Sequence, residues 1–276
     1  MAEVVDELIE LRGLRFHYRD WAATKSGARD LVLLHGLSGH ARSWDHFASH
    51  MSDRYRVIAL DQRGHGESGW AEAGAYAIGD MADDFAAFVS AMGLADFTLL
   101  GLSMGGMVTI DYAGRRPAGL AAAVIVDIGP EIVTSGVQRI QTGMRANDVF
   151  ASKDEAFAAA RAANAVPPEA HHRARSDANL MRTEDGRWTF RFDRAFRAGA
   201  LRPRDVEGSW RSCSQIAVPT LVMRGADSDI LSPEIAERMI EVIPRAELVE
   251  VPAAGHAIPL DNPEGFLAAA RGWLQG

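Results

Sequence analysis

FTLLGLSMGGMVTIDYAG, residues 97–114, is the stretch of sequence that decides the fold. The apolar run Phe97–Leu100 predicts a buried strand, and an apolar segment of helical length follows the turn. The turn between them reads G-x-S-x-G, a pattern that is typical of a nucleophile elbow when a strand precedes it and a helix follows. Gly101 and Gly105 leave space where a Cβ would clash, and Ser103 stands at a helix N-terminus, which favours negative charge. We therefore predict that Ser103 is a nucleophile rather than an incidental serine in a glycine-rich turn.

The composition is that of an ordinary soluble globular protein. The chain has 276 residues, of which 47% are hydrophobic and 24% are charged, with a net charge of −8. This length suits one large domain, or a core with an insertion. No basic run or stripe occurs, so nucleic acid and anionic membranes are not expected as partners.

The compartment is inferred from cysteine usage and from the beginning of the chain. A single cysteine, Cys213, excludes an intramolecular disulfide and is expected to be buried and inert. The first residues carry acidic side chains and no apolar core of a secretory signal, and no stretch reaches the roughly 18 apolar residues of a membrane span. We expect a cytoplasmic protein.

Strands and helices alternate along most of the chain. A hairpin is expected over residues 8–21, and helices over 76–92, 232–243 and 263–274. Short buried strands are expected at 31–34, 57–60, 97–100, 122–126, 220–223 and 248–251. This rhythm predicts an α/β fold with a mostly parallel sheet and helices on both faces.

The rhythm stops between residues 131 and 210. This segment is rich in Arg and Ala, with helices expected at 153–163 and 169–182 and an extended stretch at 187–192. We interpret it as a lid inserted into a core made of residues 1–130 and 211–276.

Polar residues follow the predicted strands directly. The carboxyl ends of parallel strands meet at one edge of a sheet, which is where ligands bind in open α/β sheets. The residues concerned are His35, Asp61, Ser103, Asp127, the loop 225–229 and His256. Their convergence predicts an active site at this edge.

A serine hydroxyl is a weak nucleophile and needs an adjacent base oriented by a third group. His256 is the strongest base candidate, because it lies in a Gly-preceded loop between the last strand and the last helix. The chain order Ser, acid, His is the one expected for this architecture. No spacing of metal ligands such as H-E-x-x-H occurs, so no metal is expected. A mechanism that uses a serine, a histidine and an acid requires no cofactor, and none is expected.

These motifs resemble those of the α/β-hydrolase superfamily over nearly the whole chain. The matching stretches, in the family's order, are His35-Gly36, DQRGHGES at 61–68, GLSMG at 101–105 and Gly255-His256. The resemblance implies an α/β-hydrolase fold, a helical lid after the sixth core strand, and an oxyanion hole formed by the backbone N–H groups of Leu37 and Met104. It also implies that His35 and His65 support loops rather than take part in the chemistry.

The acid has two candidates. Asp229 lies in the loop after the seventh core strand, where most members of the superfamily keep it, but the usual position, three residues after the glycine, is Ser228. Asp127 lies in VIVDIGP at the tip of the sixth strand, as in a subset of the superfamily with a similar stretch. A buried carboxylate there needs a partner, which a histidine N–H would supply. We favour Asp127.

The expected activity is hydrolysis of a small carboxylic ester, amide or related acyl bond through an acyl-enzyme. Serine at the elbow argues against epoxide hydrolases and haloalkane dehalogenases, since those relatives have Asp there. Carbon–carbon bond hydrolases of ring-cleavage products, enol-lactonases and a perhydrolase use the same scaffold and stay open. A ligand-binding receptor on this fold is the non-enzyme alternative.

The substrate is expected to be a small molecule, and lid side chains would select it. Arg139, Arg145 and Trp210 could contact an anionic or aromatic substrate, although each arginine could equally be a solvated surface residue. The sequence leaves the substrate and the oligomeric state open.

Overall fold

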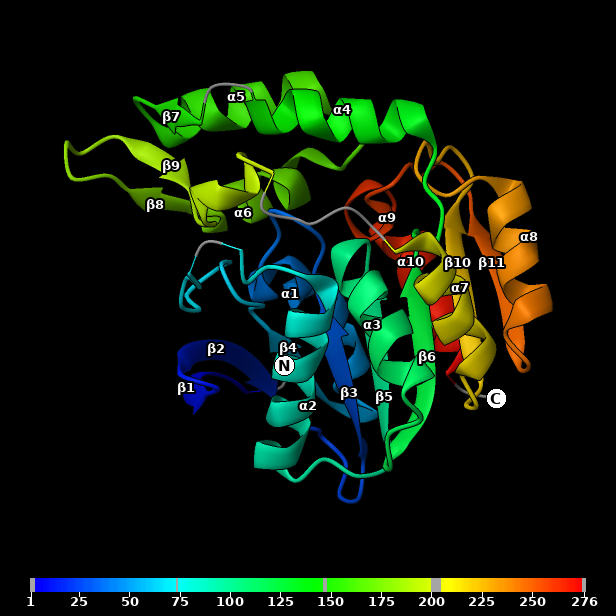
Figure 1. Ribbon diagram of the computed structural model, residues 1–276. Coiled ribbons are helices and arrows are strands. Elements are labelled where there is room, and N and C mark those ends of the chain that lie inside the picture. Colours follow the sequence, from blue (N-terminus) through cyan, green and yellow to red (C-terminus); the bar gives the residue numbers. More distant parts are fainter. Residues whose placement is uncertain (1–2, 73, 146–147, 200–204, 275–276) are drawn as a thin grey trace.

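The computed structural model describes residues 3–72, 74–145, 148–199 and 205–274. Among these residues, eight strands form one sheet (Figure 1). In sheet order they are β1 (Val4–Leu11), β2 (Leu14–Trp21), β4 (Tyr55–Leu60), β3 (Arg29–Leu34), β5 (Phe97–Leu102), β6 (Leu120–Val126), β10 (Thr220–Gly225) and β11 (Ala246–Val251). β1 and β2 form an antiparallel hairpin, β2 pairs antiparallel with β4, and the strands from β4 to β11 are parallel. The predicted α/β fold with a mostly parallel sheet is confirmed.

Helices cover both faces of the sheet, so the central strands bury side chains in both directions. In β3, Leu31 and Leu33 join one apolar cluster, while Val32 and Leu34 join the other. The first cluster includes residues of α1 (Asp45–Met51) and α10 (Pro263–Trp273). The second includes residues of α2 (Ile78–Met92), α3 (Met104–Gly114), α7 (Val206–Gln215) and α8 (Pro233–Val242). Two short helices, at Ala41–Trp44 and α9 (Ile258–Asp261), lie at strand ends.

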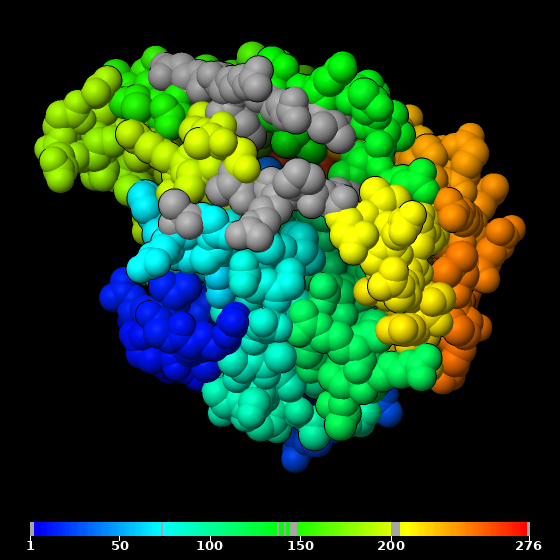
Figure 2. All heavy atoms as spheres, in the orientation of Figure 1, coloured from blue at the N-terminus to red at the C-terminus, as the bar shows by residue number. Residues whose placement is uncertain are grey.

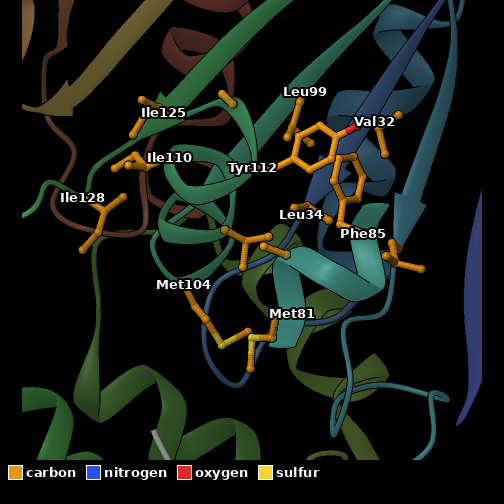
Figure 3. Packing of buried hydrophobic residues seen from close by; sticks show 14 of the residues in the cluster. Val32, Leu34, Met81, Phe85, Leu99, Met104, Ile110, Tyr112, Ile125 and Ile128 are labelled. Atoms are coloured by element: carbon orange, nitrogen blue, oxygen red, sulfur yellow. The ribbon is translucent and has the colours of Figure 1, made fainter. Parts of the chain in front are cut away.

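The core beneath the elbow holds α3 in place. Figure 3 shows side chains of α2 and α3 pointing into an apolar layer shared with strands β3, β5 and β6. The rings of Phe85 and Tyr112 meet edge to face, with centroids 4.7 Å apart. Such a pair adds about 0.5–1.5 kcal/mol beyond its area burial. The helix that carries the N–H groups beside Ser103 is thus fixed by packing on both α2 and the sheet.

A separate layer lies over the carboxyl ends of the parallel strands (Figures 1 and 2). We call residues 134–196 the cap layer. It contains α4 (Thr134–Arg145), α5 (Lys153–Ala163), α6 (Glu169–Ala178), a short 3₁₀ helix at Arg194–Phe196, and a small antiparallel sheet. The strands of that sheet, in order, are β7 (Val149–Phe150), β9 (Trp188–Phe190) and β8 (Leu180–Arg182).

The structure differs from the sequence-based expectation for this segment in three places. α4 and the small sheet were not predicted, and the helix expected over 169–182 ends at Ala178, after which the chain forms β8. The expected end of the inserted segment, residue 210, falls inside α7. α7 packs on α3 of the core: Gly114 of α3 faces the backbone of Ser212 so closely that a Cβ would not fit.

The cap layer is joined to the core by backbone hydrogen bonds. The N–H of Gly66 donates to the carbonyl of Arg191 at 2.9 Å, and the N–H of Asp193 donates to the carbonyl of Gly64 at 2.7 Å. Between them, the ring of His65 lies against Phe192 and Phe196. The DQRGHGES loop is therefore the platform on which the cap layer rests. Among the described helices, none combines the length and apolarity that crossing a bilayer requires.

Candidate active site

Ser103 occupies a strained turn between β5 and α3. Its φ is 52° and its ψ is −112°, a region that residues other than glycine rarely adopt. The flanking residues must be glycine because no room exists for a side chain. A Cβ on Gly101 would overlap the backbone of Gly105, and a Cβ on Gly105 would overlap the carbonyl of Leu34. The turn therefore projects the Ser103 hydroxyl away from the sheet, at the first turn of α3.

Three of the side chains predicted from sequence meet at this turn. The hydroxyl of Ser103 lies 2.9 Å from Nε2 of His256, and Nδ1 of His256 lies 2.8 Å from Oδ2 of Asp127. Asp127 is fully buried, and its carboxylate accepts from Nδ1–H, which leaves Nε2 to accept from the serine. The three groups form a continuous hydrogen-bonded chain from a buried anion to a hydroxyl at the elbow.

Two further groups hold the Asp127 carboxylate. The N–H of Gly225 donates to Oδ1 at 2.9 Å, and the hydroxyl of Ser228 donates to Oδ2 at 2.5 Å. The resemblance places the acid most often at the position of Ser228, and here this serine donates to the carboxylate that directly follows β6. Hydrogen bonds of this kind offset the cost of burying a carboxylate. The role of Ser228 was not anticipated from the sequence.

Asp229 has a different partner. Its carboxylate accepts two hydrogen bonds from Arg139 of α4, from Nε at 2.6 Å and from Nη2 at 2.8 Å. This bond to the Arg139 guanidinium holds the pKa of Asp229 below its usual value. Among the described residues, no hydrogen bond joins Asp229 to His256, which bonds instead to Asp127. Asp229 therefore forms an ion pair that connects the core to the cap layer.

Two backbone N–H groups beside Ser103 have no acceptor within the described part of the chain. Met104 is the first residue of α3, and neither its N–H nor that of Leu37 donates to a protein group there. Leu37 lines the same cavity as Ser103. These are the two donors that the resemblance names for an oxyanion hole, and both are free to receive an acceptor from a substrate.

His35 holds the loop that carries Leu37. Its Nδ1–H donates to the carbonyl of Gly36 at 2.8 Å, and its Nε2 accepts from the N–H of Gln62 at 3.0 Å. Burial lowers the pKa of His35 to about 4, so the ring is neutral at pH 7 and can both donate and accept. His35 therefore links the ends of β3 and β4, as the resemblance implied.

A cavity of about 320 Å³ opens onto Ser103 and His256. Core loops form its floor, and α4, α6 and β9 of the cap layer form its other walls. Of the candidate substrate contacts, Arg139 lines this cavity. Trp210 does not, because its indole N–H donates to Glu131 at 2.8 Å and its ring lies under Arg238. The side chain of Arg145 lies outside the described residues.

The cavity also contains residues that the sequence analysis missed. They are Arg175 of α6, Asn179 directly after that helix, Phe190 at the end of β9, Phe192, and Arg197. The one available signal was the Arg-rich composition of the segment, which does not say which arginines face inward. No cluster of His, Cys, Asp or Glu suited to holding a metal occurs in the described ranges.

A family model for the alpha/beta hydrolase fold matches residues 31–263. The chain belongs to this family. The match includes the elbow, both candidate acids and His256, and the named relatives are hydrolases and esterases. The protein is therefore an enzyme of the hydrolase class.

Curated relatives and solved structures are similar to this chain over nearly its full length. The chain is 28% identical over 262 residues to a 3-hydroxybutyrate-oligomer hydrolase of Cupriavidus necator, covering 90% of this chain and 89% of that one. It is 27% identical over 250 residues to the 2-(acetamidomethylene)succinate hydrolase of Mesorhizobium japonicum, covering 88% and 87%. A crystal structure of an alpha/beta hydrolase from Novosphingobium aromaticivorans superposes with a TM-score of 0.84 at 29% identity, covering 98% of each chain.

Proposed function

We propose that this alpha/beta hydrolase is a serine hydrolase that cleaves a small carboxylic ester, amide or related acyl bond through an acyl-enzyme. The observation that carries the proposal is the hydrogen-bonded chain from Asp127 through His256 to Ser103 at the floor of a cavity lined by the core and the cap layer. Such a chain is the arrangement that activates a serine hydroxyl.

In the first half of the reaction, Oγ of Ser103 attacks the substrate carbonyl carbon while Nε2 of His256 takes the hydroxyl proton. The carbonyl oxygen becomes an oxyanion, which the N–H groups of Leu37 and Met104 stabilise. His256 then gives its proton to the leaving alcohol or amine, and the acyl group stays on Ser103. Asp127 stabilises the imidazolium throughout and remains ionised.

In the second half, water replaces the leaving group. His256 takes a proton from the water, whose oxygen attacks the acyl carbon, and a second oxyanion forms at the same donors. Collapse of this intermediate returns the proton to Ser103 and releases the carboxylic acid. The cap layer, which we propose acts as a lid, limits the water that reaches the site, and this strengthens its electrostatic interactions.

The test is turnover by purified wild-type protein and two variants on a panel of 4-nitrophenyl esters, lactones, amides and vinylogous diketones. Ser103→Ala removes only the nucleophilic oxygen, and His256→Ala removes the base. Because members of a triad act as a unit, each variant should lose on the order of 10⁴–10⁶ in kcat. Undiminished ester hydrolysis by folded Ser103→Ala would disprove the proposal, and turnover of the diketones alone would assign the site to carbon–carbon bond hydrolysis.

A further inference from the structure

Arg175 brings an uncompensated positive charge to the cavity. It lies on α6, and its side chain lines the cavity together with Ser103 and His256. Its guanidinium donates one long hydrogen bond to a protein group, from Nε to the hydroxyl of Ser43 at 3.4 Å. Within the described ranges, no carboxylate lies within 4 Å of it, and Nη1 and Nη2 have no hydrogen-bond acceptor.

The other two arginines of the cavity each have a carboxylate partner. Arg139 forms its two-point contact with Asp229. Nε of Arg197 lies 3.3 Å from Oδ2 of Asp148, a carboxylate that it shares with Arg194. Within the described ranges, Arg175 is therefore the arginine of this cavity that has no carboxylate within 4 Å.

Burying the Arg175 guanidinium without an anionic partner costs free energy, which a bound anion would offset. The surrounding groups desolvate the guanidinium, and this lowers the pKa of Arg175 from its ordinary value, with only the more distant Asp261 acting in the opposite direction. A structural arginine in such surroundings normally meets a carboxylate or several carbonyl oxygens. The fork formed by Nη1 and Nη2, which has no acceptor among the described residues, instead matches the geometry of a ligand carboxylate.

The position of Arg175 brings such a ligand close to the reacting bond. A small recess lined by Arg175 also touches Gly36, Leu102 and Ala257. These three residues are the sequence neighbours of Leu37, Ser103 and His256, respectively. A group bound at Arg175 therefore belongs to the same small molecule whose carbonyl lies over Ser103.

We infer that the substrate carries a carboxylate in addition to the bond that is cleaved, and that Arg175 binds this carboxylate. The inference rests on the proposed use of the cavity as the substrate site of a serine hydrolase. It makes Arg175 a specificity-determining residue, supplied by the cap layer, for anionic esters or amides.

The experiment compares pairs of esters that differ in one charge. In the first pair, mono-4-nitrophenyl adipate has a carboxylate at the end of its acyl group, and 4-nitrophenyl hexanoate lacks it. In the second pair, 4-(butanoyloxy)benzoate has a carboxylate on its leaving group, and its methyl ester lacks it. For at least one pair, wild-type kcat/KM should favour the anion tenfold or more, and Arg175→Met should lower that ratio by about 10- to 100-fold, mainly through KM. Arg175→Lys should retain part of the preference.

Arg173→Met is the matched control. Arg173 lies on the same helix but pairs with Asp154 and Asp177 and does not line the cavity. Its replacement should leave the charge ratio within about twofold of wild type. Ester hydrolysis with no anionic preference, or with a preference that survives Arg175→Met, overturns the inference and leaves the proposed function standing.

A binding measurement separates this inference from the activity. Calorimetric titration of wild-type protein with adipate, and with adipamide as the neutral counterpart, needs no turnover. Binding of adipate alone, lost in Arg175→Met and kept in Arg173→Met, supports carboxylate recognition even if no ester is cleaved, in which case the proposed acyl transfer is what fails. Equal binding of adipate by wild type and Arg175→Met contradicts the inference.

Discussion

Replacing Asp127 by Asn tests whether both oxygens of its carboxylate must accept hydrogen bonds. Oδ1 accepts from the N–H of Gly225, and Oδ2 accepts from both His256 and Ser228. Asparagine keeps one acceptor oxygen and gains an NH₂ group, which can only donate. Asparagine also tolerates the left-handed backbone at this residue, where φ is 49°, so the fold should survive.

Either orientation of the amide disturbs the site. If the oxygen keeps the Gly225 N–H, the NH₂ group faces Nδ1 of His256 and forces that nitrogen to accept. The proton then moves to Nε2, which faces Ser103 and can no longer take its proton. If the amide is reversed, two donors meet at Gly225, at a cost of about 1–3 kcal/mol. The wrong tautomer costs on the order of 10⁴ in kcat, or about 5 kcal/mol of transition-state stabilisation.

The assay is kcat for a 4-nitrophenyl ester at neutral pH, with thermal unfolding to verify the fold. Asp229→Asn is the matched control, because Asp229 contacts Arg139 rather than His256 and should cost less than about tenfold. The reverse ranking of the two variants would return the acid's role to Asp229. Small and similar losses in both would refute the tautomer argument.

Further predictions concern the supports of the site. Ser228→Ala removes a hydroxyl donor to the proposed triad acid and should lower kcat about tenfold without moving KM. Gly105→Ala places a Cβ against the carbonyl at the end of β3 and should reduce the free energy of unfolding by about 3 kcal/mol or more, as measured with denaturant. Burial lowers the pKa of His35 to about 4 and that of His65 to about 3 in the folded protein. As the pH falls below 6.5, these two histidines are therefore protonated in the unfolded chain while they stay neutral in the folded one. Stability should therefore drop between pH 6.5 and 5, by about 2 kcal/mol per histidine, and urea midpoints that stay constant over this range would contradict the assignment.

The core could be predicted because its signals are local. Each parallel strand is a short apolar run between turn residues, and the helices α2, α8 and α10 each have an apolar face with recognisable ends. α1 was not predicted. The elbow adds a requirement for glycine at two fixed positions, which the backbone contacts of Gly101 and Gly105 explain. Residues in the loops after parallel strands reach one edge of the sheet by topology alone, so the convergence of Ser103, Asp127 and His256 could be predicted.

The cap layer could not be predicted to the same depth. α6 ends at Ala178 because the chain then pairs in the small sheet with β9, a contact between segments that no local pattern reports. The choice between Asp127 and Asp229 depends on Arg139, which approaches from another element. The inward orientation of Arg175 is likewise set by packing of the cap layer on the core.

The central claim is that Ser103 is the nucleophile that becomes acylated, and covalent labelling tests it most directly. Wild-type protein is treated with a fluorophosphonate and examined by intact mass and peptide mapping. The account predicts one adduct per chain, located on Ser103, no adduct in folded Ser103→Ala, and much slower labelling in His256→Ala. An adduct on another residue, or equal labelling of Ser103→Ala, would contradict it.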